Sequence, residues 1–449
     1  MERGYVTLGL LNLEACFEGV VPSIIATADG NGVPNISYLS HVAMVDGDHV
    51  ALSNQFFAKT SANIRLNPQA ALVAVDARNG AQFRLDLAFA YSLDDGPLFE
   101  QLSRHLDATS AQVGMAGIMR LRGLDVFRVL RIESIRSTIE PERNPSPARD
   151  RLVAAARVIE MIAAESDAAG IVDATLGGIR SWLGFEHGLF LELYEERRQL
   201  VTIGSLGYAP SGIGSDVELG QCVIGAAAES GSIVKVSDMS RVRRLNAAVR
   251  DSSSDENRTR SIVLPGMPDA MSQIAVPLIV AGVVRGALFF ESRARLAFTK
   301  ADEAALSIIA RQAALALAFS ERNSEEAEVG HRAVQLSPAT DRTIHVAHHR
   351  FDDSIFIDGN YVIKGVAGRL LAFMLDQHLT SGRNEFTNRE IRLDSGLRLP
   401  DFKDNLETRL LLLRRRLEEK RLPIRLIRLG RGRIGFEVEG RVRLSREGA

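Results

Sequence analysis

Hydrophobic and polar positions divide the chain into three patterned blocks. Two polar, proline-containing stretches interrupt the pattern at 140–150 and 320–342, and their composition is typical of linkers. The blocks cover residues 1–139, 150–321 and 344–446. Because 449 residues is about three times the length of a common domain, we expect three domains, each with its own core.

The first block consists of short alternating or β-branched runs that are bounded by Gly- and Asp-rich turns. This pattern predicts a small β-barrel, interrupted by one helix at 97–106. The predicted strands cover 23–28, 35–45, 49–53, 70–76, 83–91 and 126–135.

The second block begins with a predicted helix at 150–165 and ends with another at 300–320, for which Thr299 is the expected N-cap. An antiparallel sheet between terminal helices predicts an α+β domain. Its strands are expected at 188–192, 199–204, 233–236, 273–280 and 283–291.

The third block predicts a strand, three helices and a hairpin, which is the order of a winged helix-turn-helix. The helices are expected at 366–377, 388–394 and 401–420, and the hairpin strands at 424–428 and 434–439. The long helix has one core face at helical spacing, formed by Phe402, Leu406, Leu410, Leu413 and Leu417. Its opposite face carries Asp404, Asn405, Thr408, Leu411, Leu412 and Arg415. The two outward leucines would either contact thymine methyl groups or pack on a partner helix.

Composition excludes several classes of protein. Hydrophobic residues make up 46% and charged residues 24% of the chain, so it is not intrinsically disordered. Cys16 and Cys222 are the only cysteines, which excludes a disulfide framework and a CxxC metal or redox site. The start of the sequence lacks the pattern of a secretory signal, and the most apolar window, 274–290, is interrupted by Pro277 and Arg285. We therefore expect a cytoplasmic protein without a membrane span.

Charge is distributed unevenly along the chain. Between Asp401 and Arg433 there are 11 Lys/Arg and 5 Asp/Glu, a net charge of +6, and since the whole chain carries −2 the remainder carries −8. A basic end on an acidic body indicates contact with a polyanion. A solvated Arg-rich helix is the alternative explanation.

Residues 52–68, LSNQFFAKTSANIRLNP, resemble the flavin-binding segment of the pyridoxamine 5′-phosphate oxidase-like split barrels. The resemblance covers most of residues 5–136 and implies an FMN site that dimerisation completes. Lys59 and Thr60, at a helix N-terminus, would hold the phosphate. The expected cofactor-binding residues are Tyr38, Ser40, Ser53, Asn54, Gln55, Lys59, Thr60 and Asn63.

The barrel family also contains deazaflavin- and haem-binding members, so these cofactors remain alternatives to FMN. His41 or His49 would be the candidate iron ligand, although a histidine beside a turn is more often a surface residue. The Arg/Trp-rich segment that binds substrate in true pyridoxamine phosphate oxidases is absent from the sequence. An empty barrel retained for dimerisation is a further interpretation.

The second block resembles a GAF domain in the segments 220–225, 232–238, 272–278, 283–288 and 302–317. GAF pockets bind various small molecules, and no residue pattern here identifies one. Cys222 would be either a redox sensor or, as we expect, a buried structural cysteine.

The segments 386–391, 405–417 and 424–436 resemble the OmpR-type winged-helix domain of response regulators. The resemblance implies that the long helix enters the major groove of double-stranded DNA and that the wing meets its backbone. The expected DNA-binding residues are Lys403, Asn405, Thr408, Arg415, Arg416, Arg431 and Arg433. A winged helix that binds protein instead of DNA is the alternative.

Taken in this order, the three domains predict a homodimeric one-component transcriptional regulator, in which a flavin-type barrel and a GAF pocket control DNA binding. The alternative is an FMN-dependent oxidoreductase with regulatory GAF and winged-helix domains. A scaffold with empty pockets is a third interpretation. Neither a catalytic residue nor a metal site is assigned, and enzymatic activity is left open.

Overall fold

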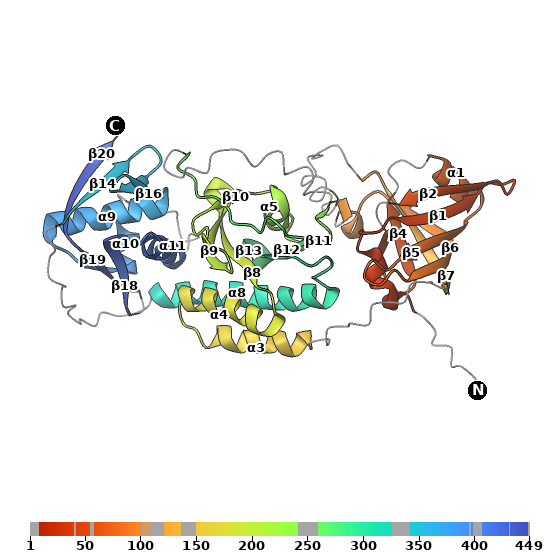
Figure 1. The fold of residues 1–449 in the computed structure, drawn as a ribbon, viewed down its shortest axis with the longest axis horizontal. Helices are drawn as coiled ribbons and strands as arrows, with labels where there is room; N and C mark the ends of the chain where they lie inside the picture. The colour runs from red at the N-terminus through yellow and green to blue at the C-terminus, as the bar shows by residue number, and fades with distance from the viewer. Residues whose placement is uncertain are drawn as a thin grey trace.

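The structure is a computed structural model of the chain. It describes residues 9–39, 42–53, 58–100, 102–103, 106, 121–135, 150–240, 259–325, 342–394, 397, 406–430 and 432–447. Three parts follow one another along the long axis of the molecule (Figure 1). They are named here the N-terminal part (9–135), the central part (150–325) and the C-terminal part (342–447).

The N-terminal part is a curled antiparallel sheet of seven strands, in the order β2-β1-β5-β6-β7-β4-β3. The predicted run at 35–45 is divided into β2 and β3, and the other predicted strands are present. The strands are β1 (Ser23–Ala28), β2 (Pro34–Leu39), β3 (Val42–Met44), β4 (His49–Ser53), β5 (Gln69–Val75), β6 (Gln82–Leu93) and β7 (Leu124–Ile135). The 3₁₀ helix η1 (Leu10–Phe17) and helix α1 (Ala58–Leu66) pack against the sheet.

The central part is a six-stranded antiparallel sheet in the order β10-β9-β8-β13-β12-β11. Its strands are β8 (His187–Tyr194), β9 (Gln199–Leu206), β10 (Asp216–Glu218), β11 (Val234–Val236), β12 (Ser272–Val280) and β13 (Val283–Ser292). Helices α3 (Arg151–Ala163), α4 (Ala168–Gly178) and α8 (Lys300–Glu325) lie on one face, and α5 (Cys222–Ser230) lies on the other (Figure 1). The short helices η2 (Ile179–Leu183) and η3 (Glu195–Arg197) complete this part.

Helix α8 begins at the expected cap. The Asp302 amide donates to Thr299 Oγ1 at 3.2 Å, and Asp302 Oδ2 accepts from the Thr299 amide at 2.8 Å. Within the described residues, Lys300–Glu321 is the one helix long and apolar enough to span a membrane by length and composition. Here its buried side chains, among them Leu306 and Ile309, belong to the core of the central part.

The C-terminal part contains the helices and the hairpin in the predicted order. A four-stranded sheet, β16-β15-β14-β20, and a three-stranded sheet, β17-β19-β18, accompany three helices. The elements are β14 (Thr343–His349), β15 (Ser354–Ile357), β16 (Asn360–Ile363), α9 (Val366–Ser381), β17 (Glu385–Thr387), α10 (Asn388–Leu393), α11 (Leu406–Glu419), β18 (Ile424–Gly430), β19 (Arg433–Val438) and β20 (Arg441–Glu447). Thr387 and Glu390 form a capping box at the start of α10.

One hydrophobic core runs from the helical face of the central part into the C-terminal part. It contains Ile171 and Leu176 of α4 together with Leu411 and Leu413 of α11. Figure 1 shows α11 on the side of the C-terminal part that faces the central part. The two parts are therefore packed through apolar side chains in addition to the linker.

Candidate functional site

Helix α1 of the N-terminal part is attached to the sheet by polar side chains. Thr60 Oγ1 accepts from Asn35 Nδ2 at 3.0 Å and lies 3.0 Å from Ser37 Oγ. Asn63 Nδ2 donates to Thr27 Oγ1 at 3.2 Å. Both Thr60 and Asn63 are buried. Two of the expected cofactor-binding residues therefore hold α1 in place.

Three other expected cofactor-binding residues lie in this helix or on the strands of the sheet. Lys59 is exposed in the first turn of α1, and Tyr38 is 71% exposed on the edge strand β2. Ser53 is buried at the end of β4. Ser40, Asn54 and Gln55 lie outside the described residues. A phosphate group at the start of α1 would meet one cation and the backbone N–H groups of a helix N-terminus.

A cluster of buried charges joins the N-terminal part to the central part. Lys235 Nζ lies 2.6 Å from Glu18 Oε2 and 2.7 Å from Glu303 Oε1, and it donates to the Phe298 carbonyl at 3.1 Å. The Lys235 side chain is only 9% exposed. Ser237 Oγ donates to the same Glu18 oxygen at 2.8 Å. We call Glu18, Lys235 and Glu303 the ion triad.

The ion triad borders a cavity of about 460 Å³ between the two parts. Its apolar wall includes Val42, Met44 and Pro277, and Arg311 and Lys300 stand on its α8 side. Burial by itself raises the pKa of the Glu303 carboxyl, but the charges of Lys235 and Lys300 outweigh this and hold the pKa below its ordinary value. Glu303 is therefore held as a carboxylate.

The outward face of α11 is covered by the central part. Thr408, Leu411 and Leu412, which the sequence places on that face, are at most 4% exposed. Leu412 lies against Gly214, in the connection between β9 and β10. Leu411 lines a small cavity of about 50 Å³ together with Ala168 at the start of α4. Of the two roles predicted for the leucines, packing is the one seen in this arrangement.

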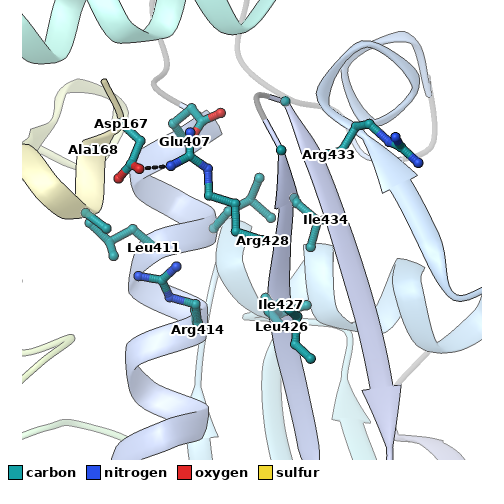
Figure 2. Close-up of a pocket in the computed structure, with 14 residues that line it drawn as sticks. Asp167, Ala168, Glu407, Leu411, Arg414, Leu426, Ile427, Arg428, Arg433 and Ile434 are labelled. Atoms are coloured by element: carbon teal, nitrogen blue, oxygen red, sulfur yellow. Dashed lines mark ion pairs between the residues drawn. The ribbon is translucent and has the colours of Figure 1, made fainter. Parts of the chain in front are cut away.

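Arginines of the C-terminal part extend to carboxylates of α4. Arg415 Nη2 lies 2.6 Å from Asp173 Oδ1, and its Nη1 donates to the Ile203 carbonyl at 2.6 Å. Arg428 of β18 pairs with Asp167, the N-cap of α4 (Figure 2). Burial lowers the pKa of the Arg415 guanidinium, and the Asp173 charge opposes that shift. We call the covered α11 face with these two ion pairs the α4–α11 junction.

The remaining expected DNA-binding residues lie in different environments. Arg416 is 2% exposed, and its Nε donates to the Val362 carbonyl at 2.9 Å, so it stabilises the interior and is not the surface phosphate contact we expected. Arg433 points away from the cavity in Figure 2 and pairs with Glu385 at 2.8 Å. Lys403, Asn405 and Arg431 lie outside the described residues.

Sequence reasoning missed α4 and therefore the two carboxylates Asp167 and Asp173. The signal was present, because Asp167 is a strong N-cap and the apolar residues Ile171, Val172 and Leu176 follow at helical spacing. Cys222, which we expected to be a buried structural cysteine, is only partly buried, and burial raises the pKa of its thiol.

Family comparisons match two of the three parts. No curated protein matches the chain. Among solved structures, an FMN-binding protein from Syntrophomonas wolfei is 19% identical, with 28% of this chain and 87% of that chain covered and a TM-score of 0.25. An F420 reductase is 15% identical, with 30% and 98% covered and a TM-score of 0.21. The GAF domain of an Acinetobacter phosphoenolpyruvate-protein phosphotransferase is 18% identical, with 38% and 95% covered and a TM-score of 0.32.

The family models give the domain assignment. Residues 12–138 match the family described as Pyridoxamine 5′-phosphate oxidase, and residues 165–318 match the GAF domain. The chain therefore carries a pyridoxamine 5′-phosphate oxidase-like N-terminal domain, followed by a GAF domain.

Proposed function

We propose that the protein is a one-component transcriptional regulator, in which the N-terminal and GAF domains control DNA binding by the C-terminal part. The observation that carries the proposal is the element order α9-β17-α10-α11-β18-β19, a helix, a helical pair and an Arg-rich hairpin. This order supports a winged helix, in which α11 would be the recognition helix and β18–β19 the wing. The net charge of +6 between Asp401 and Arg433 supports a polyanionic partner.

Duplex DNA is the partner that this chemistry fits best. Arg431, which precedes Arg433 by two positions in the sequence, and Arg433 would supply cations for backbone phosphates, and Arg415 of α11 would add a third. Phosphate contacts of this kind position a reading helix without specifying sequence. Lys403 and Asn405, just before α11, remain proposed contacts.

The N-terminal domain fits a phosphate-bearing flavin in part. Lys59 is exposed at the first turn of α1, while Thr60 and Asn63 fix that helix to β1 and β2. We propose that Lys59 and the adjacent backbone N–H groups hold the phosphate of FMN, with a deazaflavin or haem as alternative occupants. Bound flavin would supply redox chemistry, and either its redox state or its occupancy would be the signal. The GAF ligand is a small molecule of unassigned class.

A homodimer is part of the proposal. Strand β2 is an edge strand, and Ile36 and Tyr38 on it are 69% and 71% exposed. An exposed apolar edge is a common site of pairing with a second copy. Two winged helices in a dimer would match paired DNA half-sites.

Salt-dependent DNA binding tests the regulator. The full chain is titrated against a random-sequence duplex at several salt concentrations, as wild type and with Arg431→Ala and Arg433→Ala combined. Each lost phosphate contact should reduce the log–log slope by about 0.9. An unchanged slope would remove the wing from the DNA interface.

The cofactor is tested by the absorption spectrum of the purified protein and by mass identification of what it releases. Retained FMN that is lost on Lys59→Ala supports the site, and equal FMN content in both proteins contradicts it. Consumption of a substrate by the FMN-loaded chain, without salt-dependent DNA binding, would favour an FMN-dependent oxidoreductase instead.

A further inference from the structure

The α4–α11 junction places acidic groups of the GAF domain where DNA phosphates are expected. Arg415 is paired with Asp173 and with the Ile203 carbonyl, and Arg428 is paired with Asp167. Figure 2 shows Arg428 on β18 extending to Asp167 across the space beside α11. Two carboxylates on one short helix thus neutralise one arginine of the proposed reading helix and one of the wing.

Apolar packing covers the same face. Leu411 and Leu412 are 4% and 3% exposed, and neither could meet a base edge while packed against the central part. The Arg409 guanidinium lies over the Tyr194 ring, 3.0 Å from its centroid. Glu419, at the end of α11, accepts from Ser211 Oγ at 2.5 Å. Side chains along the length of α11 are therefore engaged by the GAF domain.

We propose that the GAF domain and double-stranded DNA compete for one face of the C-terminal part, with Asp167 and Asp173 acting as phosphate mimics. The inference rests on the proposed DNA-binding function. In the closed arrangement α11 packs on α4, and DNA binds only after the two separate. A ligand of the GAF domain regulates DNA binding by the difference in its affinity for the closed and the separated forms.

The test removes the mimics from the GAF side, so that no residue of the proposed DNA interface changes. Asp167→Asn keeps an N-cap residue at α4, because Asn and Asp are comparable caps, and Asp173→Asn keeps the shape of the side chain. The matched control is Glu160→Gln with Glu186→Gln. These carboxylates of the central part are 65% and 60% exposed and pair with Arg157 and Arg180, so the control makes the same change in net charge.

Two readouts are measured on the full chain: affinity for a random-sequence duplex, and hydrogen exchange of the α11 amides without DNA. The Asp167→Asn, Asp173→Asn protein should bind DNA about 5- to 150-fold more tightly than wild type, the usual range of coupling between sites. Its α11 amides should exchange faster. The control should resemble wild type in both readouts.

A second variant covers the case in which the leucines alone keep the junction closed. Ala169 lines the cavity of about 50 Å³ at the α4–α11 junction, together with Arg414 and Arg428. In Ala169→Arg the larger side chain fills this cavity, and its positive charge repels those of the two arginines. Faster α11 exchange without a gain in DNA affinity over wild type overturns the competition and leaves DNA binding standing. If the α11 amides exchange faster in the variants, but neither wild type nor any variant binds DNA, both the proposed function and the competition are overturned. Unchanged exchange and affinity in both variants overturn the competition.

Discussion

The GAF domain has two junctions, and they are held by different forces. The junction with the N-terminal domain centres on the ion triad, in which Lys235 is 9% exposed between two carboxylates. The α4–α11 junction centres on leucines of a continuous core, with ion pairs at its edge. A buried charge left without its partner is costly, whereas apolar packing depends on shape and area. The first junction should therefore respond mainly to charge and pH, and the second to side-chain volume as well as to loss of its two ion pairs.

The largest effect is expected from Lys235→Met. The change leaves Glu18 and Glu303 buried without their shared cation, so the free energy of unfolding should fall by about 3–5 kcal/mol. Urea unfolding is followed by the fluorescence of Trp182, the single tryptophan, which lies in the GAF domain. Arg198→Met is the control, because the Arg198 side chain is 70% exposed beside Glu229 and should contribute about 1 kcal/mol or less. Equal losses in the two proteins would mean that the ion triad is solvated.

Leu412→Ala tests the apolar junction. Removal of this buried side chain beside Gly214 leaves a cavity and should lower the free energy of unfolding by about 2–5 kcal/mol. The same urea titration measures it. Leu393→Ala on α10 is the control, since Leu393 is 75% exposed. If Leu412→Ala cost no more than its control, α11 would not be packed on the GAF domain in solution.

Acid should weaken the junction with the N-terminal domain. The folded-state pKa of Glu303 lies below its ordinary value of 4.5, so its carboxylate stabilises the fold above that pH, and the contribution is lost as pH falls through the folded pKa. Unfolding free energies are compared for wild type and Glu303→Gln from neutral pH to below 4.5. Wild type should lose stability more steeply below that pH. Parallel curves would be evidence against the charged triad.

The smallest effect is expected from an ordinary surface pair. Arg180 and Glu186 lie 3.0 Å apart, close to the spacing in the ion triad, but both side chains are more than half exposed. Glu186→Gln should change the unfolding free energy by about 1 kcal/mol or less. A cost as large as that of Lys235→Met would show that burial does not distinguish the two pairs.

Much of the fold could be predicted from periodicity. Five of the six predicted strands of the first block, the cap at Thr299 and the helix order of the third block are present. The run at 35–45 was predicted as one strand because alternation does not reveal where a chain leaves one edge of a sheet for the other; β2 and β3 lie at opposite edges.

The candidate sites were harder to predict, because their environment depends on contacts between residues far apart in sequence. Arg416 was expected at a DNA phosphate, but the fold of its own domain brings the Val362 carbonyl to it. The ion triad joins Glu18, Lys235 and Glu303 from three separate segments, and no local pattern indicates that they meet. Periodicity identified Leu411 and Leu412 as outward, but it could not identify α4 as what covers them.

Competition between the GAF domain and DNA for α11 is tested most directly by hydrogen exchange of α4, at Ala168–Gly178, in wild-type protein with and without saturating duplex DNA. If DNA displaces the GAF domain, α4 loses its cover, and its amides should exchange faster when DNA is bound, while those of α11 stay protected by DNA. This follows from linkage, since a GAF contact that weakens DNA binding must itself be weakened by DNA. Unchanged α4 exchange on a DNA-saturated protein would contradict the competition.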